Sequence, residues 1–395
     1  MNNWIAKLSE IAEKERRLII GLMSGTSLDG LDIALCKISG SGLNTKAQVL
    51  AFETISYSDE FKNQIKKIAF LKIVDLELLC SLNKKIGEMH GEMVNSFLKS
   101  RNINPENIDL IASHGQTIYH SPANSRESDG FGNSTLQIGD ADQISVKTNI
   151  VTVSDFRQKN IAQGLEGAPL AIYGDYLLFN HPTENRILLN IGGISNFTYL
   201  PAGGKFNTIL STDVGPGNKI MDQFINKIDP QLFYDKNGEM AALGKTNEEF
   251  LAALLNHSFF ELSFPKSTGP ELFNLDYLYS AISKCKSDPI SNQDILATLN
   301  LFTAKSIEIA IRKTTANLKD TVIYISGGGN HNFLLTSNLK NLLHDCSFKN
   351  LSDLGINPDA KEALLFAILA NETVAGDYKD LNNETLSMGK ISLPF

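Results

Sequence analysis

Cysteine, tryptophan and long apolar runs are all scarce in this chain of 395 residues. The four cysteines, Cys36, Cys80, Cys285 and Cys346, lie far apart and include no CxxC pair, so nothing indicates a zinc site or a dense disulfide framework. We expect buried thiols in a reducing compartment. Residues 1–17 alternate charged and apolar positions, and no run of about 18 uncharged apolar residues occurs, so the sequence predicts neither a secretory signal nor a membrane span. The expected location is the cytoplasm.

Positive charge is also in deficit, because 36 Lys and Arg against 44 Asp and Glu give a formal net charge of −8. A protein that binds nucleic acid clusters Lys and Arg on its surface, so this balance disfavours such a partner. The chain is 42% hydrophobic and 20% charged, which is ordinary for a globular protein and argues against disorder or a coiled coil. The length favours two lobes of similar size, which we place at residues 1–180 and 181–395.

Short apolar runs that end in glycine-containing turns recur along the chain and predict strands. The expected strands are 17–23, 31–38, 47–57, 108–112, 150–154, 186–191, 194–200, 208–212 and 321–326. The expected helices are 59–69, 75–101, one whose first turn holds Pro216, and 358–375, which we expect to pack back toward the first lobe. Each lobe begins with a hairpin, and alternating strands and helices imply an α/β fold class.

Three polar turns, 24–30, 213–218 and 326–330, each follow an apolar run directly. Backbone N–H groups in glycine-rich turns neutralise phosphate charge without steric interference. One such turn most often only reverses the chain, but three after three strands favour a nucleotide site. Asp29 and Asp213 stand beside two of the turns, where one or two carboxylates suffice to hold a hydrated Mg²⁺; the alternative is that both merely cap turns.

Competing phosphate and hydrolase motifs are absent. Gly244-Lys245-Thr246 resembles the end of a P-loop, but Gly238 lies one residue too far upstream for that motif. No GxSxG pattern surrounds Ser27 or Ser195, so a serine hydrolase is not indicated.

Seven strings, in order, closely resemble the 1,6-anhydro-N-acetylmuramic acid kinase family. They are GLMSGTSLDGLDIAL (21–35), ASHGQTIYH (112–120), LQIGDADQIS (136–145), LLNIGGISNFTYL (188–200), TDVGPGN (212–218), FPKSTGPELFN (264–274) and SGGGNHN (326–332). The resemblance spans residues 17–394. It implies the two-lobed, ribonuclease H-like ATPase fold of actin, hexokinase and Hsp70, with ATP and Mg²⁺ in the interlobe cleft, a small amino-sugar substrate and a homodimer.

The reaction that this resemblance implies belongs to cell-wall recycling. Water attacks the anomeric carbon and opens the 1,6-anhydro bridge, and the freed O6 takes the γ-phosphoryl group of ATP to give N-acetylmuramic acid 6-phosphate. By the same resemblance, the expected ATP-binding residues are Gly25, Thr26, Ser27, Leu28, Asp29, Gly30, Leu31, Asp32, Asp213, Gly215, Gly217, Asn218, Gly327, Gly328 and Gly329. The expected sugar-binding residues are His114, Gln116, Asp155, Arg157 and Glu362.

The chain departs from the family at the general base. The family pattern DFRxxDxAxGGQGAPL appears as DFRQKNIAQGLEGAPL at 155–170, so Asn160 occupies the position of the basic aspartate. An amide cannot take a proton at neutral pH, and loss of a general base typically costs about 10²–10⁴ in rate. Glu166 replaces a glutamine six residues on and is a candidate replacement base, although it is equally compatible with a solvated loop carboxylate. The alternatives are a kinase for a different amino sugar or a catalytically impaired homologue that binds ATP and sugar.

Overall fold

The structure is a computed structural model that describes residues 2–25, 28–121, 132–269, 271–286, 289–376 and 387–395. The chain forms two compact units: unit 1 comprises Met1–Leu178 and Gly355–Phe395, and unit 2 comprises Phe179–Leu354. This division differs from the sequence-based one, which assigned the whole of 181–395 to the second lobe. The last 41 residues, 355–395, instead belong to unit 1.

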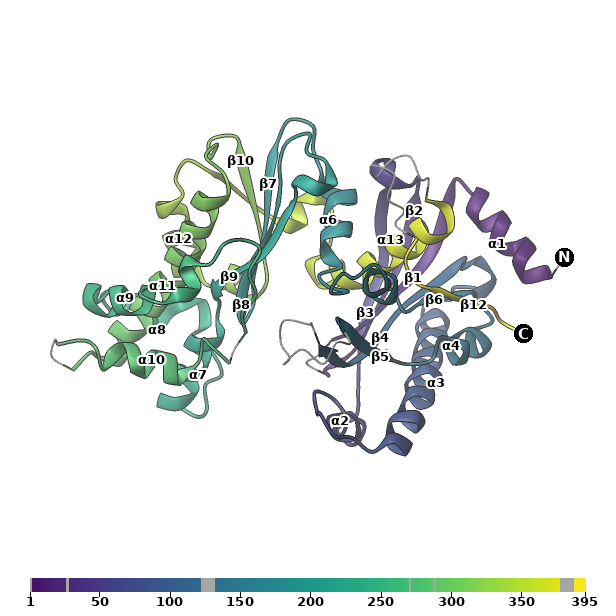
Figure 1. Ribbon diagram of the computed structural model, residues 1–395, viewed down its shortest axis with the longest axis horizontal. Coiled ribbons are helices and arrows are strands. Elements are labelled where there is room, and N and C mark those ends of the chain that lie inside the picture. Colours follow the sequence, from purple (N-terminus) through teal and green to yellow (C-terminus); the bar gives the residue numbers. More distant parts are fainter. Residues whose placement is uncertain (1, 26–27, 122–131, 270, 287–288, 377–386) are drawn as a thin grey trace. The chain divides into compact units, whose positions relative to one another are not determined.

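Unit 1 contains a seven-stranded mixed sheet of order β12-β6-β4-β1-β2-β3, with β5 paired to β4 (Figure 1). Its strands are β1 (Arg16–Ser24), β2 (Gly30–Ser39), β3 (Lys46–Ser56), β4 (Leu110–Ser121), β5 (Ser134–Ile138), β6 (Thr152–Ser154) and β12 (Lys390–Ser392). Its helices are α1 (Asn3–Glu13), α2 (Asp59–Lys66), α3 (Leu76–Ser100), α4 (Ala141–Thr148), α5 (Gln158–Ala162), α6 (Ala171–Phe179), whose last residue is assigned to unit 2, and α13 (Lys361–Ala375).

Unit 2 contains a five-stranded sheet of order β11-β10-β7-β8-β9. Its strands are β7 (Asn185–Ile191), β8 (Ile194–Leu200), β9 (Leu210–Pro216), β10 (Thr321–Ser326) and β11 (Ser347–Asn350). Its helices are α7 (Lys219–Ile228), α8 (Glu239–Ala242), α9 (Glu248–Leu255), α10 (Leu275–Ile282), α11 (Asn292–Thr314) and α12 (Phe333–Leu342).

The two units repeat one topology. In unit 1, β1, β2 and β3 are antiparallel and β4 and β6 continue the sheet in parallel; in unit 2, β7, β8 and β9 are antiparallel and β10 and β11 continue it in parallel. The predicted hairpin at the start of each lobe is therefore confirmed, as is the α/β class. This duplicated order is that of the ribonuclease H-like, two-lobed fold expected from the sequence.

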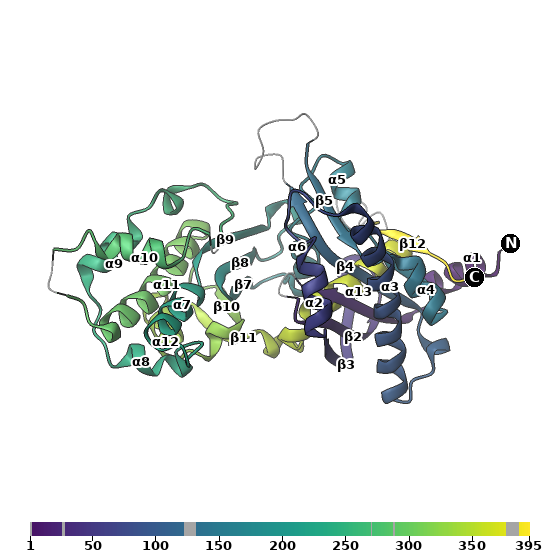
Figure 2. The same cartoon turned by 90° about the horizontal axis from the view of Figure 1, so that it is seen from below.

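Both faces of the unit 1 sheet are covered by helices. Ile20 and Leu22 of β1 belong to the core built with α3, whereas Gly21 lies against the backbone of Ala363 in α13. Because successive residues of a strand point to opposite faces, α3 and α13 lie on opposite sides of the sheet. Helix α4 packs beside α3 (Figure 2). This arrangement explains why residues 355–395 belong to unit 1. The sequence predicted such a return to the first lobe only for the final helix, 358–375.

Two local expectations were wrong. Pro216 does not open a helix: β9 continues through it, paired with Ile194, and α7 begins at Lys219. A proline is accommodated there because β9 is an edge strand, where a missing N–H breaks no ladder. The cysteines are free, but of the four only Cys36 is buried, and Cys80 is exposed. No helix in the described ranges is long and apolar enough to cross a membrane.

A buried polar cluster joins α13 to the loop after β2. Glu372 accepts hydrogen bonds from the backbone N–H of Gly42 at 3.0 Å and from Thr45 Oγ1 at 3.2 Å. Its neighbour Asn371 accepts one from Arg17 Nε at 2.7 Å. Burial raises the pKa of Glu372, and these donors and the Arg17 charge lower it again. The cluster ties the last helix to the first hairpin.

We expect Glu372→Ala to lower the free energy of unfolding by about 1–3 kcal/mol, because the buried donors of Gly42 and Thr45 lose their acceptor. Glu372→Gln keeps one acceptor oxygen and should lose less than half as much. Urea unfolding of both variants and the wild-type chain measures the difference. Equal losses for the two substitutions would contradict this account.

Candidate active site

The turn between β1 and β2 is anchored by Gln116 of β4. The Gln116 amide donates from Nε2 to the carbonyl of Gly25 at 3.3 Å and accepts at Oε1 from Ser24 Oγ at 2.6 Å. The sequence predicted a sugar-binding role for Gln116. These contacts show that it also holds the turn between β1 and β2, which is expected to face the ATP phosphates. Thr26 and Ser27 of that turn lie outside the described residues.

A buried hydrogen-bond chain extends from this turn into the core. Since Ser24 donates to Gln116, the Tyr57 hydroxyl at 2.8 Å donates to Ser24, and His90 Nε2, 2.8 Å from Tyr57, donates to that hydroxyl. This direction leaves His90 Nδ1 as an acceptor, and it has no partner in the part of the chain that the structure describes. Burial lowers the pKa of His90 to about 3, so the ring is neutral in the folded protein.

His90 should make the protein sensitive to acid. Because its folded pKa is depressed below the unfolded value of about 6.5, the unfolded state takes up the proton first. Its contribution to stability is complete above about pH 6.5 and falls by about 1.4 kcal/mol per pH unit down to about pH 3. His90→Gln keeps a donor to Tyr57 and removes the titration. Urea unfolding between about pH 7 and pH 4 should therefore give a shallower acid slope for the variant, and parallel slopes would refute the assignment.

The residues expected near the phosphates are not equally available. Leu28 and Leu31 are buried core side chains, so only their backbone can serve a ligand. Asp29 is exposed, and Asp32 is half-buried with Oδ1 accepting from Thr54 Oγ1 at 2.6 Å. Gly30 pairs with β3, and its Cα lies where a Cβ would meet the carbonyl of Ile55 at 2.3 Å.

Like charges gather beside this turn. The pKa of Asp32 is raised, chiefly by loss of water and further by the carboxylates of Asp359 and Asp29. The pKa of Glu362 is raised by desolvation and then by Asp32, although part of its side chain is exposed. Lys361 and Arg157 oppose that rise. Mutually repelling carboxylates at the start of β2 and around the start of α13 make this edge of unit 1 suited to a cation.

Arg157 joins β4 to the loop that follows α5. Its Nε donates to His114 Nε2 at 3.0 Å, and its Nη1 donates to the carbonyl of Gly167 at 2.8 Å. His114 Nδ1 lies 3.0 Å from the carbonyl of Gly115, to which it donates because Nε2 is an acceptor. Burial and the Arg157 charge lower the pKa of His114 to about 3. His114 is therefore a neutral acceptor that positions Arg157, which in turn holds the loop.

The two candidate base residues differ in accessibility. Asn160 is 6% exposed on α5, and its side-chain amide has no hydrogen bond within the described ranges. Glu166 is exposed on the loop that Arg157 holds. Burial and the Arg157 charge lower the pKa of His120, and the nearby Glu166 carboxylate opposes that shift. A second anchor of the loop is Asn133, which donates from Nδ2 to the carbonyl of Gly164 at 3.1 Å.

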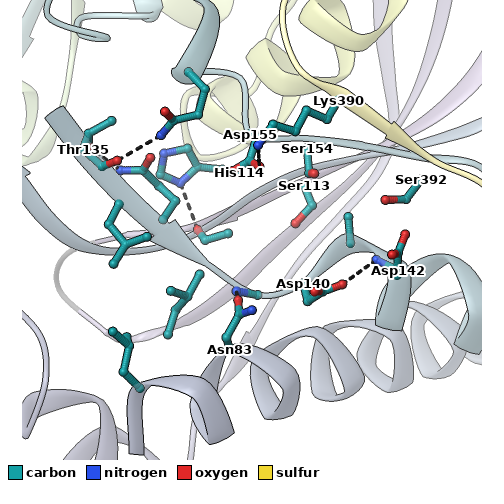
Figure 3. Close-up of a pocket in the computed structure, with 18 of the residues that line it drawn as sticks. Asn83, Ser113, His114, Thr135, Asp140, Asp142, Ser154, Asp155, Lys390 and Ser392 are labelled. Carbon is teal, nitrogen blue, oxygen red and sulfur yellow. Dashed lines mark hydrogen bonds and ion pairs between the residues drawn. The ribbon is translucent and has the colours of Figure 1, made fainter. Parts of the chain in front are cut away.

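The Asp155 carboxylate forms an ion pair with Lys390. Its Oδ2 lies 2.8 Å from Nζ of Lys390 on β12 (Figure 3). Its backbone has a φ of 55°, in the left-handed region that non-glycine residues rarely adopt. The structure thus places Asp155 against the last strand of unit 1, separate from the Arg157 contacts that its neighbour in the sequence makes.

In unit 2, three turns meet at the ends of β7, β9 and β10. The N–H groups of Gly217 and Asn218 donate to the carbonyls of Gly193 and Gly192 at 3.0 and 2.7 Å. A Cβ on Gly217 would lie 2.2 Å from the Gly192 oxygen, so only glycine permits this approach. Gly327 has a φ of 82°, and a Cβ there would lie 2.6 Å from the carbonyl oxygen of Ile191 at the end of β7. The turns 213–218 and 327–329 are therefore neighbours.

Asp213 is held by a segment to which sequence reasoning gave no role. Its N–H donates to the carbonyl of Lys266 at 3.0 Å, and its Oδ2 accepts from the N–H of Thr268 at 2.9 Å. Burial raises the pKa of Asp213, and Thr268 opposes that rise. Lys266 lies over the ring of Phe259 at 4.0 Å, and burial lowers its pKa to about 8. The sequence signal for this segment was the string KSTG at 266–269. The corresponding signal for the turn that contacts Gly217 and Asn218 was the glycine pair 192–193.

The residues fit a magnesium ion that is held mainly by a nucleotide. No group of three or more His, Cys, Asp or Glu with metal-binding geometry occurs among the described residues, which excludes a preformed protein cage there. Magnesium is usually held by one or two carboxylates together with phosphate oxygens and water. Exposed Asp29 and half-exposed Asp213 each offer such a carboxylate in its own unit.

Comparison with known proteins agrees with this geometry. The family model described as anhydro-N-acetylmuramic acid kinase matches residues 17–393. A protein of that name from Pseudoalteromonas translucida is 50% identical over 99% of both chains, and one from Pseudoalteromonas atlantica is 50% identical over the full length of both. Another from Caldanaerobacter subterraneus is 42% identical over 98% of this chain and all of its own. The chain therefore belongs to the anhydro-N-acetylmuramic acid kinase family.

Proposed function

We propose that this protein uses ATP to convert 1,6-anhydro-N-acetylmuramic acid into N-acetylmuramic acid 6-phosphate. The observation that carries the proposal is the family match across residues 17–393, to which the glycine turns at the strand ends of each unit add a physical basis. One bond forms between water oxygen and C1 as the C1–O6 bond breaks. O6 then bonds to the γ-phosphorus as the bond to the leaving ADP oxygen breaks, and the water proton passes to a base.

Phosphate binding falls to backbone donors and to short turns. In unit 1 the turn after Gly25, held by Gln116, presents backbone of the kind that takes phosphate oxygens. In unit 2 the N–H groups of Gly217 and Asn218 are paired with the carbonyls of Gly193 and Gly192 and so fix the shape of the phosphate turn. Gly327–Gly329 would pack near the nucleoside. Asp29 and Asp213 are the proposed carboxylates for Mg²⁺, which offsets the charge that develops during phosphoryl transfer.

Sugar binding is assigned to residues of unit 1. Glu362 and Arg157 influence each other's ionisation, and the planar guanidinium of an arginine is suited to bind a carboxylate such as that of a muramic acid. His114 keeps Arg157 in place and does not transfer protons near neutral pH, because its pKa is about 3. Asp155, paired with Lys390, contributes to the shape of the site.

Glu166 is the proposed base for the attacking water. An exposed carboxylate on an anchored loop meets the two requirements of a base, which are access to water and a fixed position. The loop follows α5, which carries Asn160, and is held at Gly167 by Arg157. We further propose, from the family resemblance, that the protein acts in the cytoplasm as a homodimer.

The direct test is incubation of the protein with Mg-ATP and the anhydro sugar, with ADP release measured and the sugar product identified by mass and by ¹⁸O uptake from labelled water. We expect stoichiometric ADP and a 6-phosphate that carries one ¹⁸O at C1. A Gly217→Ala variant serves as a control, because its Cβ would clash with the Gly192 carbonyl and disturb the unit 2 turn. Phosphorylation of N-acetylmuramic acid or N-acetylglucosamine but not of the anhydro sugar would establish a different kinase, and ATP binding without turnover a binding protein.

A further inference from the structure

A polar pocket of about 620 Å³ lies in unit 1 between the starts of α3 and α4 and the strands β5, β6 and β12 (Figure 3). Its wall includes His114 and Asp155, to which a role is given above, and Lys390, the ion-pair partner of Asp155. Arg157, Asn160, Glu362 and the turn at Gly25 do not belong to it. The pocket thus adjoins the proposed reaction site at His114 and Asp155 without including its other residues, and its volume is within the range of small-molecule sites.

Ser113 marks the pocket as a place for a polar ligand. It is 1% exposed on β4, and its hydroxyl has no hydrogen-bond partner among the residues described. Figure 3 shows the hydroxyl directed into the space above Asp140. A buried hydroxyl that is left unpaired is unfavourable, so a bound group that pairs with it would gain a hydrogen bond without displacing one.

The charges of the wall favour a ligand without an acid group. Asp155 is paired with Lys390 at 2.8 Å, which leaves Asp140 and Asp142 at the start of α4. Asp140 accepts from the N–H of Asp142 at 2.8 Å, and the Asp142 carboxylate is on the exposed side. The wall therefore has an excess of negative charge, which repels carboxylates and phosphates and attracts amines.

The remaining polar groups offer a ligand both an acceptor and a donor. Gln158 donates from Nε2 to the carbonyl of Thr135 at 2.9 Å, so its amide oxygen remains for a ligand. Asn83 accepts at Oδ1 from the N–H of Gly139 at 2.8 Å, so its amide N–H₂ group remains as a donor. Leu79 and Leu136 add apolar surface to the wall, which suits the C–H face of a sugar ring.

We propose that this pocket binds an amino sugar that lacks an acid group, such as a hexosamine. Its hydroxyls would donate to the carboxylates of Asp140 and Asp142, and its amine would meet their charge. The inference goes beyond the proposed kinase reaction, whose muramic acid substrate carries a carboxylate that this wall disfavours. His114, adjacent to Ser113, lies in the wall and also holds Arg157, so occupancy is linked to the proposed reaction site through one residue.

Cys80 provides a probe of occupancy. It lines the pocket and is exposed, whereas Cys36 is buried and Cys285 and Cys346 lie elsewhere. We expect D-glucosamine to slow alkylation of Cys80 by iodoacetamide in a saturable manner, measured on the full chain by peptide mass spectrometry. Alkylation of Cys285 and Cys346 is the internal control and should not change.

Two substitutions in the pocket wall and a second sugar, N-acetylmuramic acid, test whether the protection of Cys80 comes from binding in this pocket. Asp142→Asn should raise the half-saturating glucosamine concentration about tenfold, because a charge-assisted contact is lost. Ser113→Ala should also weaken protection, while leaving the fold intact since the hydroxyl has no partner to lose. N-acetylmuramic acid should protect less than glucosamine. The proposal would be overturned if glucosamine gave Cys80 no saturable protection, if it protected both variants as well as the wild-type chain, or if N-acetylmuramic acid protected Cys80 more strongly than glucosamine. None of these outcomes depends on kinase turnover.

Discussion

Glu166→Gln is expected to lower kcat for anhydro-sugar phosphorylation by about 10²–10⁴, the usual contribution of a general base. The substitution preserves size and removes only the ability to take a proton from water. Because Glu166 is exposed, we expect the free energy of unfolding to change by less than about 0.5 kcal/mol. The measurement is steady-state ADP release with the anhydro sugar, together with urea unfolding of the same preparations.

The matched control restores a base where the family has one. Asn160→Asp in the Glu166→Gln background should recover a large part of the lost rate, since Asn160 lies on α5 directly before that loop and occupies the family position of the aspartate. Asn160→Asp alone should change kcat by less than the double variant gains. Full activity in Glu166→Gln would instead direct attention to Glu362, whose pKa is raised by desolvation and by Asp32, which makes its carboxylate a stronger base.

The turns and hairpins were readable from the sequence because their signals are local. An apolar run that ends in glycines predicted β1 and β7, and the polar turn at 326–330 marked the end of β10 correctly, whereas β9 continues through Pro216 into the turn expected at 213–218. Pro216 was misassigned because a proline after glycine is typical of a helix start, and only the pairing of β9 with β8 reveals an edge strand. Long-range pairing of that kind leaves no local trace.

The contacts that organise the site were less accessible to sequence reasoning. Nothing in the letters indicates that Gln116 holds the turn at Gly25, that Lys266 and Thr268 hold Asp213, or that Arg157 reaches both His114 and Gly167. Each contact joins residues that are 10 to 91 positions apart or lie on separate strands. The last 41 residues, 355–395, return to unit 1, and the sequence predicted this only for the helix at 358–375. The rest could not be predicted because the burial of α13 against β1 depends on the folded sheet.

Arg157→Met is expected to lower kcat/KM about 10²-fold, mainly through kcat, because the loop that carries Glu166 loses its anchor at Gly167 and small misplacements of a catalytic group are costly. Arg157→Lys should recover little, since an ammonium cannot reproduce two donors in the fixed geometry of a guanidinium. Steady-state kinetics across pH measures both variants.

The pH profile separates an effect on the site from a general loss of structure. Arg157 lowers the pKa of Glu362, so its removal allows that pKa to rise further. If Glu362 must be ionised to bind or position the sugar, the acid limb of kcat/KM moves to higher pH in Arg157→Met, because a larger fraction of Glu362 is protonated at each pH. A variant that is slower at every pH with an unshifted acid limb would show that Arg157 supports the loop alone, whereas a shift with an unchanged maximum would show that it acts on Glu362 alone.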